Sequence, residues 1–168
     1  MGRKPISLLT GACTVVLLLL AACGGGKPNN APTAGGSCAG LEVDAAKITQ
    51  PDGWKPNAGG LSDADLLGKG LELWKDKSLS REGNSACISC HSNATALYKE
   101  SFATPFPHEV AMAREKAGKP SVTAAEMVQM CMIVPMGAKP LEWDEIKLAA
   151  LTRAVEENQK DYKAATGK

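Results

Sequence analysis

The chain has 168 residues, 10 prolines and an aromatic fraction of only 4%, which suits one small domain with additional targeting or linker segments. Its 19 basic and 18 acidic residues almost cancel, whereas a nucleic-acid-binding protein needs a strongly basic face. We therefore expect no nucleic-acid partner.

The first 22 residues have the composition of an export signal. Arg3 and Lys4 form a positively charged start, and an apolar stretch from residue 6 to residue 22 follows. This stretch is short for a membrane-spanning helix, which needs ~20 apolar residues. Small residues then precede Cys23, and the pattern resembles the lipobox of bacterial lipoproteins. The resemblance implies that residues 1–22 are removed and that Cys23 carries the lipid. In the alternative, an ordinary secretory signal, Cys23 is incidental.

A lipid on Cys23 would anchor the mature protein without a membrane span, because each buried CH₂ of an acyl chain contributes ~0.8 kcal/mol. We expect a location on the periplasmic side of a bacterial membrane. Gly24 stands where an aspartate often retains enterobacterial lipoproteins at the inner membrane, which favours the outer membrane. Residues 23–60 are rich in glycine and proline, so we expect a flexible tether, with a short strand or turn near 41–48 left open.

The folded domain is expected at 61–160. Ser62 is followed three residues later by Asp65, an approximate capping box, and apolar residues then recur with helical spacing up to Trp74. A glycine-rich turn at 81–85 leads into a pair of cysteines.

Three further helices are expected along the chain. The first covers 109–117 and stops at Gly118, and the second is capped by Thr123 and ends before Pro135. The third runs from residue 143 or 144 to about 158, and residues 161–168 are expected to form a disordered tail. The fold class predicted from these patterns is all-α.

The sequence Cys87-Ile88-Ser89-Cys90-His91 matches the C-x-x-C-H pattern that attaches haem covalently. The two thiols add across the two vinyl groups of the porphyrin, and the adjacent histidine binds the iron from the proximal side. We therefore expect one covalently bound haem c, with Cys87 and Cys90 as thioethers and His91 as the proximal iron ligand. Because the motif occurs once, a multihaem array is excluded.

Three other interpretations of the motif remain open. A zinc site would need two more ligands, for which Cys38, Cys131 and His108 remain. A thioredoxin-like dithiol would need a βαβ context, which the pattern lacks. A disulfide within the motif is sterically awkward and gives no role to His91.

Five sulfur side chains are candidates for the second axial ligand of the haem iron: Met127, Met130, Cys131, Met132 and Met136. We expect Met136, because Pro135 places it on an extended loop that can lay its side chain over the haem. Methionine opposite histidine raises the potential and suits an electron carrier. The other methionines are expected to fill gaps on an apolar helix face.

Cys131 is the alternative distal ligand. A thiolate lowers the potential and suits catalysis more than electron carriage. In an oxidising compartment Cys131 could instead form a disulfide with Cys38. His108 is expected at the surface or at a helix N-terminus, with distal ligation as its alternative.

The stretch Gly68-Lys69-Gly70-Leu71-Glu72-Leu73-Trp74, the motif, a methionine-bearing loop and a C-terminal helix resemble class I cytochrome c. The resemblance implies a small fold of about four helices around one covalent haem. Its N- and C-terminal helices would cross at a small residue, here Gly70 against the turn 148–151.

A second resemblance rests on the stretch Ala86-Cys87-Ile88-Ser89-Cys90-His91, with Met130-Cys131 and then Met136-Gly137-Ala138-Lys139-Pro140-Leu141 before the last helix. Between about 61 and 155 the chain is similar to the haem domains of the SoxA subunit of sulfur-oxidising cytochromes. In that family the cysteine that corresponds to Cys131 ligates haem and carries a persulfide. Met132 stands where the catalytic form has a basic residue. This difference favours a relationship of fold over one of thiosulfate chemistry.

Together these patterns predict a periplasmic, membrane-tethered monohaem cytochrome c that transfers single electrons between redox partner proteins, rather than an enzyme. The alternative is a subunit of a thiosulfate-oxidising enzyme with Cys131 as haem ligand or sulfur carrier. A third interpretation is a haem domain that binds a gas at an open iron site.

Overall fold

The computed structural model describes residues 42–168; the expected signal peptide, the lipidation site Cys23 and Cys38 lie outside this range. Along the chain its helices are η1 (Ala45–Lys47), α1 (Asp63–Leu73), η2 (Lys77–Leu79), α2 (Cys87–Cys90), η3 (Glu100–Ala103), α3 (Ala111–Ala117), α4 (Ala124–Ile133) and α5 (Ile146–Thr166), where η marks a 3-10 helix. The described part has no strand, and one isolated bridge joins His108 to Val122. The all-α prediction is confirmed.

Polar side chains explain where α1 and α4 begin. The hydroxyl of Ser62 accepts a hydrogen bond from the Asp65 N–H at 3.2 Å. The hydroxyl of Thr123 accepts from the Glu126 N–H at 3.2 Å, and the Glu126 carboxylate accepts from the Thr123 N–H at 2.9 Å. Both predicted helix starts are confirmed.

The ends of α3 and α4 also follow the sequence signals. α3 ends where Gly118 adopts a φ of 63°, a left-handed conformation that glycine adopts without a Cβ penalty. α4 ends at Ile133, ahead of Pro135. Glycine and proline therefore stop these helices as predicted.

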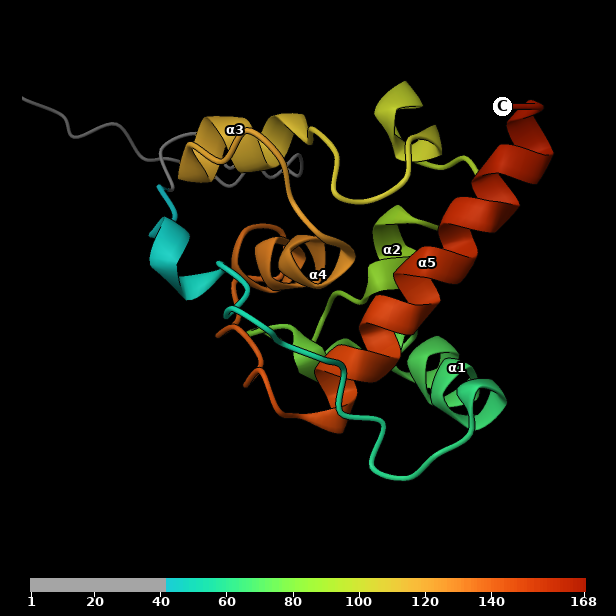
Figure 1. The fold of residues 1–168 in the computed structure, drawn as a ribbon, viewed down its shortest axis with the longest axis horizontal. Helices are drawn as coiled ribbons and strands as arrows, with labels where there is room; N and C mark the ends of the chain where they lie inside the picture. Colours follow the sequence, from blue (N-terminus) through green and yellow to red (C-terminus); the bar gives the residue numbers. More distant parts are fainter. Residues whose placement is uncertain (1–41) are drawn as a thin grey trace, which may run out of the picture. The chain divides into compact units, whose positions relative to one another are not determined.

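α1 and α5 cross at close range (Figure 1). Gly70 is buried at the crossing, and a methyl group built on it would lie 2.2 Å from the carbonyl oxygen of Ala150. A side chain there would force the two helices apart, because protein interiors leave no spare volume. The expected contact between Gly70 and the turn 148–151 is confirmed.

α5 extends well beyond its predicted end near residue 158. Tyr162 is buried and packs its ring against Phe102, with 5.6 Å between centroids. The hydroxyl of Thr166 donates to the Tyr162 carbonyl oxygen at 2.7 Å, and Lys168 forms an ion pair with Glu100. The expectation of a disordered tail at 161–168 is therefore wrong. The sequence did not predict this extension of the helix, because the single buried ring of Tyr162 in a mostly polar stretch produces no apolar periodicity.

Residues 42–60, expected to be the end of the tether, pack against the helical domain. Val43 and Ile48 are buried in a cluster with Val122, Met130 and neighbours. The packed part therefore begins by Val43 and not near residue 61. Composition pointed to a linker because Val43 and Ile48 are separated by polar and small residues, and prolines and glycines recur from Pro51 onwards.

A second contact secures the later part of this segment. The indole N–H of Trp54 donates to the Trp143 carbonyl oxygen at 2.6 Å, and the two rings meet edge to face. Asn57 donates through its side-chain amide to the Asp144 carbonyl oxygen at 2.7 Å. The segment is thus attached to the chain just before α5.

Glu126 joins the same segment to α4. Its side chain is only 8% exposed, and its carboxylate accepts from the Gln50 N–H at 2.9 Å and pairs with Lys119 at 2.9 Å. Burial alone would raise the pKa of Glu126, but the bonds from Gln50, Lys119 and Thr123 lower it below the usual 4.5. The charged carboxylate is therefore a stabilising part of the fold.

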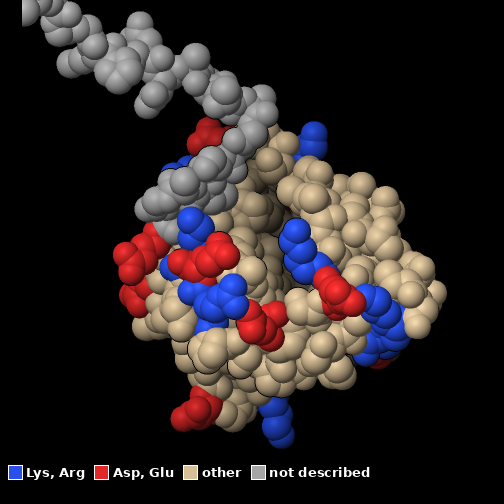
Figure 2. Space-filling model, turned by 90° about the horizontal axis from the view of Figure 1, so that it is seen from above, with Lys and Arg blue, Asp and Glu red and all other residues tan. Residues whose placement is uncertain are grey.

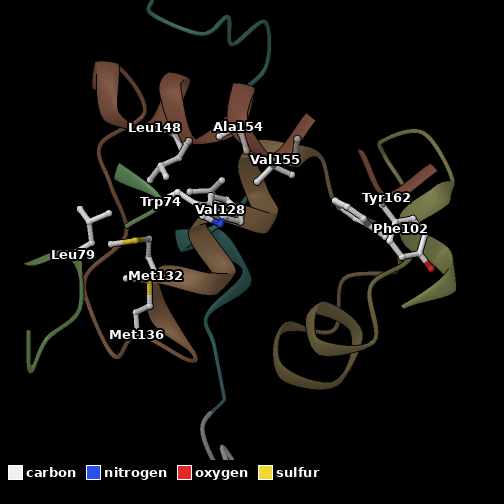
Figure 3. Close-up of a cluster of buried hydrophobic side chains, with 13 residues drawn as sticks. Trp74, Leu79, Phe102, Val128, Met132, Met136, Leu148, Ala154, Val155 and Tyr162 are labelled. Atoms are coloured by element: carbon white, nitrogen blue, oxygen red, sulfur yellow. The ribbon is translucent and has the colours of Figure 1, made fainter. Parts of the chain in front are cut away.

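The largest hydrophobic cluster lies where α1, α4 and α5 meet. Figure 3 shows Met132 and Met136 beside Leu79, with Phe102 and Tyr162 together on the other side of the cluster. On the face shown in Figure 2, basic and acidic side chains lie next to one another. Among the helices of residues 42–168, none has the length and apolar character needed to cross a membrane.

We expect Gly70→Ala to lower the free energy of unfolding by about 1–3 kcal/mol or more, because its Cβ would collide with the Ala150 backbone. Gly68→Ala is the matched control: it lies on the same helix, and a Cβ there meets nothing within 4 Å. That variant should gain up to ~1 kcal/mol from helix propensity. Urea unfolding measures both, and equal effects would contradict the proposed crossing.

We expect Glu126→Gln to lose about 1.5–3 kcal/mol of stability near neutral pH, the usual contribution of hydrogen bonds to a charged group. Because the pKa of Glu126 is lower in the folded chain, its contribution is complete above the usual carboxyl pKa and disappears as the pH falls through the folded value. Wild type and variant should therefore converge on acidification. Urea unfolding at neutral and acidic pH tests this, and a constant difference would refute it.

Candidate functional site

A mostly apolar cavity of about 190 Å³ lies between the segment 85–91 and α4. Trp74, at the end of α1, contributes one part of the wall. Residues between 97 and 111 and residues between 127 and 136 contribute the rest, together with Leu151 and Val155 of α5. The cavity is therefore built from segments that are far apart in the sequence.

Cys87, Cys90 and His91 all line this cavity. The first two residues are the ends of the short helix α2, which the sequence did not predict as a helix. The Ile88 N–H donates to the Trp74 carbonyl oxygen at 3.0 Å, and the Ser89 hydroxyl accepts from the Ala86 N–H at 3.1 Å. The first bond holds α2 against the end of α1, and the second caps the start of α2. Cys87 is half-buried and Cys90 is exposed.

The imidazole of His91 is oriented by a backbone carbonyl. Its Nδ1 lies 3.1 Å from the Ala96 oxygen, and Asn93 holds that turn by accepting from the Ala96 N–H at 2.9 Å. Burial lowers the pKa of His91, and the bond to Ala96 partly opposes this effect. A neutral ring whose Nδ1 donates to a carbonyl leaves Nε2 available, which is the usual arrangement of a metal-binding histidine.

Tyr98 covers the same ring and was not predicted from the sequence. Its ring stacks on His91 with 4.3 Å between centroids, and Phe102 stacks on its other face at 4.1 Å. Its hydroxyl is buried without a hydrogen-bond partner. Burial, and then the neighbouring Cys131 and Cys87, raise the pKa of Tyr98. Tyr98 therefore keeps its proton and lies close to the thiols.

α4 supplies the sulfur-rich side of the cavity. Met127, Cys131 and Met132 line it, whereas Met130 is fully buried in the cluster of Val43 and Ile48. Of the five sulfur side chains considered as ligands, Met130 is thus directed away from the cavity, and the other four border it.

Met136 also lines the cavity and is 6% exposed, but it does not lie on the extended loop that we expected. It belongs to the turn that closes α4: its N–H donates to the Cys131 oxygen at 3.2 Å, and its own oxygen accepts from the Arg81 N–H at 3.0 Å. Gly137, with a φ of 60°, follows directly and completes the change of direction. Pro135 ends the helix, and the helix end positions Met136.

The buried amide of Gln129 secures the segment after this turn. It donates to the Leu141 carbonyl oxygen at 2.7 Å and accepts from the Leu141 N–H at 2.8 Å. This pair of bonds imitates a backbone ladder and attaches the segment to α4. Apolar periodicity had marked the helix, but it gave no sign of this role for Gln129.

The described cysteines, Cys87, Cys90 and Cys131, are free thiols. Burial raises the pKa of Cys87 to about 11 and that of Cys131 to about 12, and the thiols reinforce one another. Cys131 keeps partial exposure because it borders the cavity. The suggested partner of Cys131 in a disulfide, Cys38, lies outside the described residues.

His108, expected at the surface or at a helix N-terminus, lies just before the N-cap of α3, but it is not at the surface. It is 6% exposed, lines the cavity and stacks on Phe106 with 4.2 Å between centroids. Its backbone forms the bridge with Val122. Two prolines beside a polar residue suggested an exposed loop, but the bridge draws that loop inward.

Comparison with known proteins gives no match for this chain among protein-family models, curated proteins or solved structures. Within residues 42–168, no group of three or more His, Cys, Asp and Glu side chains is arranged to hold a metal ion. A haem iron does not require such a group of side chains, because the porphyrin supplies four ligands and the protein only one or two. Function must therefore be inferred from the cavity itself.

Proposed function

We propose that this chain is a monohaem c-type cytochrome that transfers single electrons between redox partner proteins, with the finer fold of class I cytochrome c. A bound haem c would supply the redox chemistry, since its iron changes oxidation state by one electron. The lipid on Cys23 would hold the protein at the periplasmic side of a bacterial membrane, with the outer membrane favoured. No substrate bond is made or broken in this function.

The observation that carries the proposal is the position of the motif. Cys87, Cys90 and His91 line a mostly apolar cavity that Met132 and Met136 also border. The donor set fits a haem c, because two thiols and an imidazole border one cavity and thioethers border the same space. An apolar wall also excludes water, which helps to keep a haem in a single coordination state.

His91 is the proposed proximal ligand. The bond between Nδ1 and the Ala96 oxygen sets the tautomer, so that Nε2 carries the free lone pair. Its lowered pKa keeps the ring unprotonated and able to bind a metal. A zinc site is less well supported, because no group of potential ligands in the described residues surrounds a single point.

Met136 is the proposed distal ligand. It is held by backbone bonds on both sides, to Cys131 and to Arg81, and Gln129 secures the segment beyond it. A ligand on a fixed turn changes little between oxidation states, which favours fast electron transfer. Met127 and Met132 border the same cavity from within α4 and are the nearest alternatives.

Cys131 supports a second candidate function. It borders the cavity near Cys87 and Cys90, as expected for a haem-ligating or sulfur-carrying cysteine in a thiosulfate-oxidising subunit. Thiosulfate-dependent reduction of the haem, or added mass on Cys131, would support this function over electron carriage.

We expect the purified chain, made in a bacterium that attaches c-type haem, to carry one haem that denaturation does not release. Mass spectrometry of the denatured protein measures this. Cys87→Ala with Cys90→Ala should abolish the covalent mass increase, because no thiol remains for the vinyl groups. Cys131→Ala is the matched control and should keep it. A wild-type chain without covalent haem would refute the proposal.

We expect the oxidised, haem-loaded protein to show the weak near-red charge-transfer band of methionine bound to ferric haem. Met136→Ala should abolish this band, whereas Met127→Ala and Met132→Ala should keep it. Optical spectra of the three variants measure this directly. A thiolate-type spectrum that disappears in Cys131→Ala would instead transfer the distal role to Cys131 and favour the second function.

A further inference from the structure

The cavity contains a polar group that neither the motif nor the sulfur side chains explain. His108 is 6% exposed, and its Nδ1 is buried and forms no hydrogen bond of good geometry. Burial lowers the pKa of the ring, and the nearby backbone of Pro105 and Thr104 only partly opposes this effect. Leaving a buried polar atom unpaired costs about 1–3 kcal/mol, so proteins rarely retain one without a reason. Because His108 also lines the cavity, a molecule bound there is the natural candidate for the missing partner.

His108 is held away from the proposed iron ligand. Ring centroids are 4.3 Å apart from His91 to Tyr98, 4.1 Å from Tyr98 to Phe102 and 6.4 Å from Phe102 to His108. The two imidazoles are therefore connected through the rings of Tyr98 and Phe102. This arrangement does not suit two histidines that share one iron, and it places His108 at another part of the cavity wall.

A cation borders the same cavity. Lys99 lines it, and among the described residues its ammonium group forms no ion pair. Of the acidic side chains nearest in the sequence, Glu100 is paired with Lys168 and Glu109 with Arg114. An imidazole N–H and an ammonium in one mostly apolar cavity are suited to carboxylates.

We propose that His108 and Lys99 form the subsite for the propionate carboxylates of the haem, an inference that rests on the proposed function. The propionates of a haem lie at the edge of the ring opposite its vinyl groups. Cys87 and Cys90 would take the vinyl edge, which leaves the carboxylates for the part of the cavity away from the thiols. His108 then donates a hydrogen bond to one carboxylate, and Lys99 supplies a positive charge.

The test uses the haem-loaded full chain and two substitutions at the same position. His108→Leu removes the donor, whereas His108→Asn keeps an N–H near the place of Nδ1. We expect His108→Leu to shift the propionate vibrations in the resonance Raman spectrum and to lower the midpoint potential, because an unpaired carboxylate stabilises ferric iron. His108→Asn should remain close to wild type in both measurements.

A second, independent experiment tests the role of Lys99 with the variant Lys99→Gln. Lys47→Gln is its matched control, because Lys47 lies outside the cavity. Lys99→Gln should lower the midpoint potential at low salt, and the shift should shrink as salt screens the exposed ammonium. Lys47→Gln should leave the potential unchanged. If His108→Leu does not load haem, His108→Asn and Lys99→Gln carry the test.

Unchanged propionate vibrations and potential in His108→Leu would overturn the proposal. Loss of the low-spin spectrum in that variant would also overturn it, because His108 would then bind the iron. Equal shifts in Lys99→Gln and Lys47→Gln would remove Lys99 from the subsite. A wild-type chain with no covalent haem would refute the proposed function itself, which separates that failure from the failure of this inference.

Discussion

The close approach of α1 and α5 at Gly70 is the constraint on which the rest of the structure depends. Because no Cβ separates the helices, the end of α1 is brought next to the first half of α5. Trp74 at that end accepts a hydrogen bond from Ile88, and so the contact fixes the position of α2 and its two cysteines. α5 contributes Leu151 and Val155 to the same cavity. A backbone contact remote from the chemistry thus determines where the proposed cofactor residues lie.

Local signals in the sequence predicted the helices well. Ser62 and Thr123 mark helix starts by pairing with backbone N–H groups, and Gly118 marks an end by its left-handed conformation. The contact of Gly70 with α5 was also predictable, from a family resemblance. The motif at 87–91 predicts haem attachment, because thiols and imidazole occur at the spacing that the porphyrin requires, and this interpretation stays a prediction.

The features that the sequence did not predict depend on distant partners. His108 is buried because its backbone pairs with Val122, and Met136 is set by a helix end and by Arg81. The segment at 42–60 is held in place because it donates hydrogen bonds to Glu126 and Trp143, which are distant in the sequence. Such contacts leave no local periodicity. Composition alone therefore suggested a linker and an exposed loop where the structure has packed residues.

The length of α5 has a practical consequence for anyone who modifies this protein. Its first half meets α1, while its second half supports the wall that bears Phe102, because Gln159 donates to the Phe102 and Thr104 carbonyl oxygens at 2.9 Å. Lys168, just after α5, is paired with Glu100. Proteolytic trimming at the carboxyl end would therefore loosen one side of the cavity and leave the motif side in place. Engineering of this region should therefore keep the last turn of α5 intact.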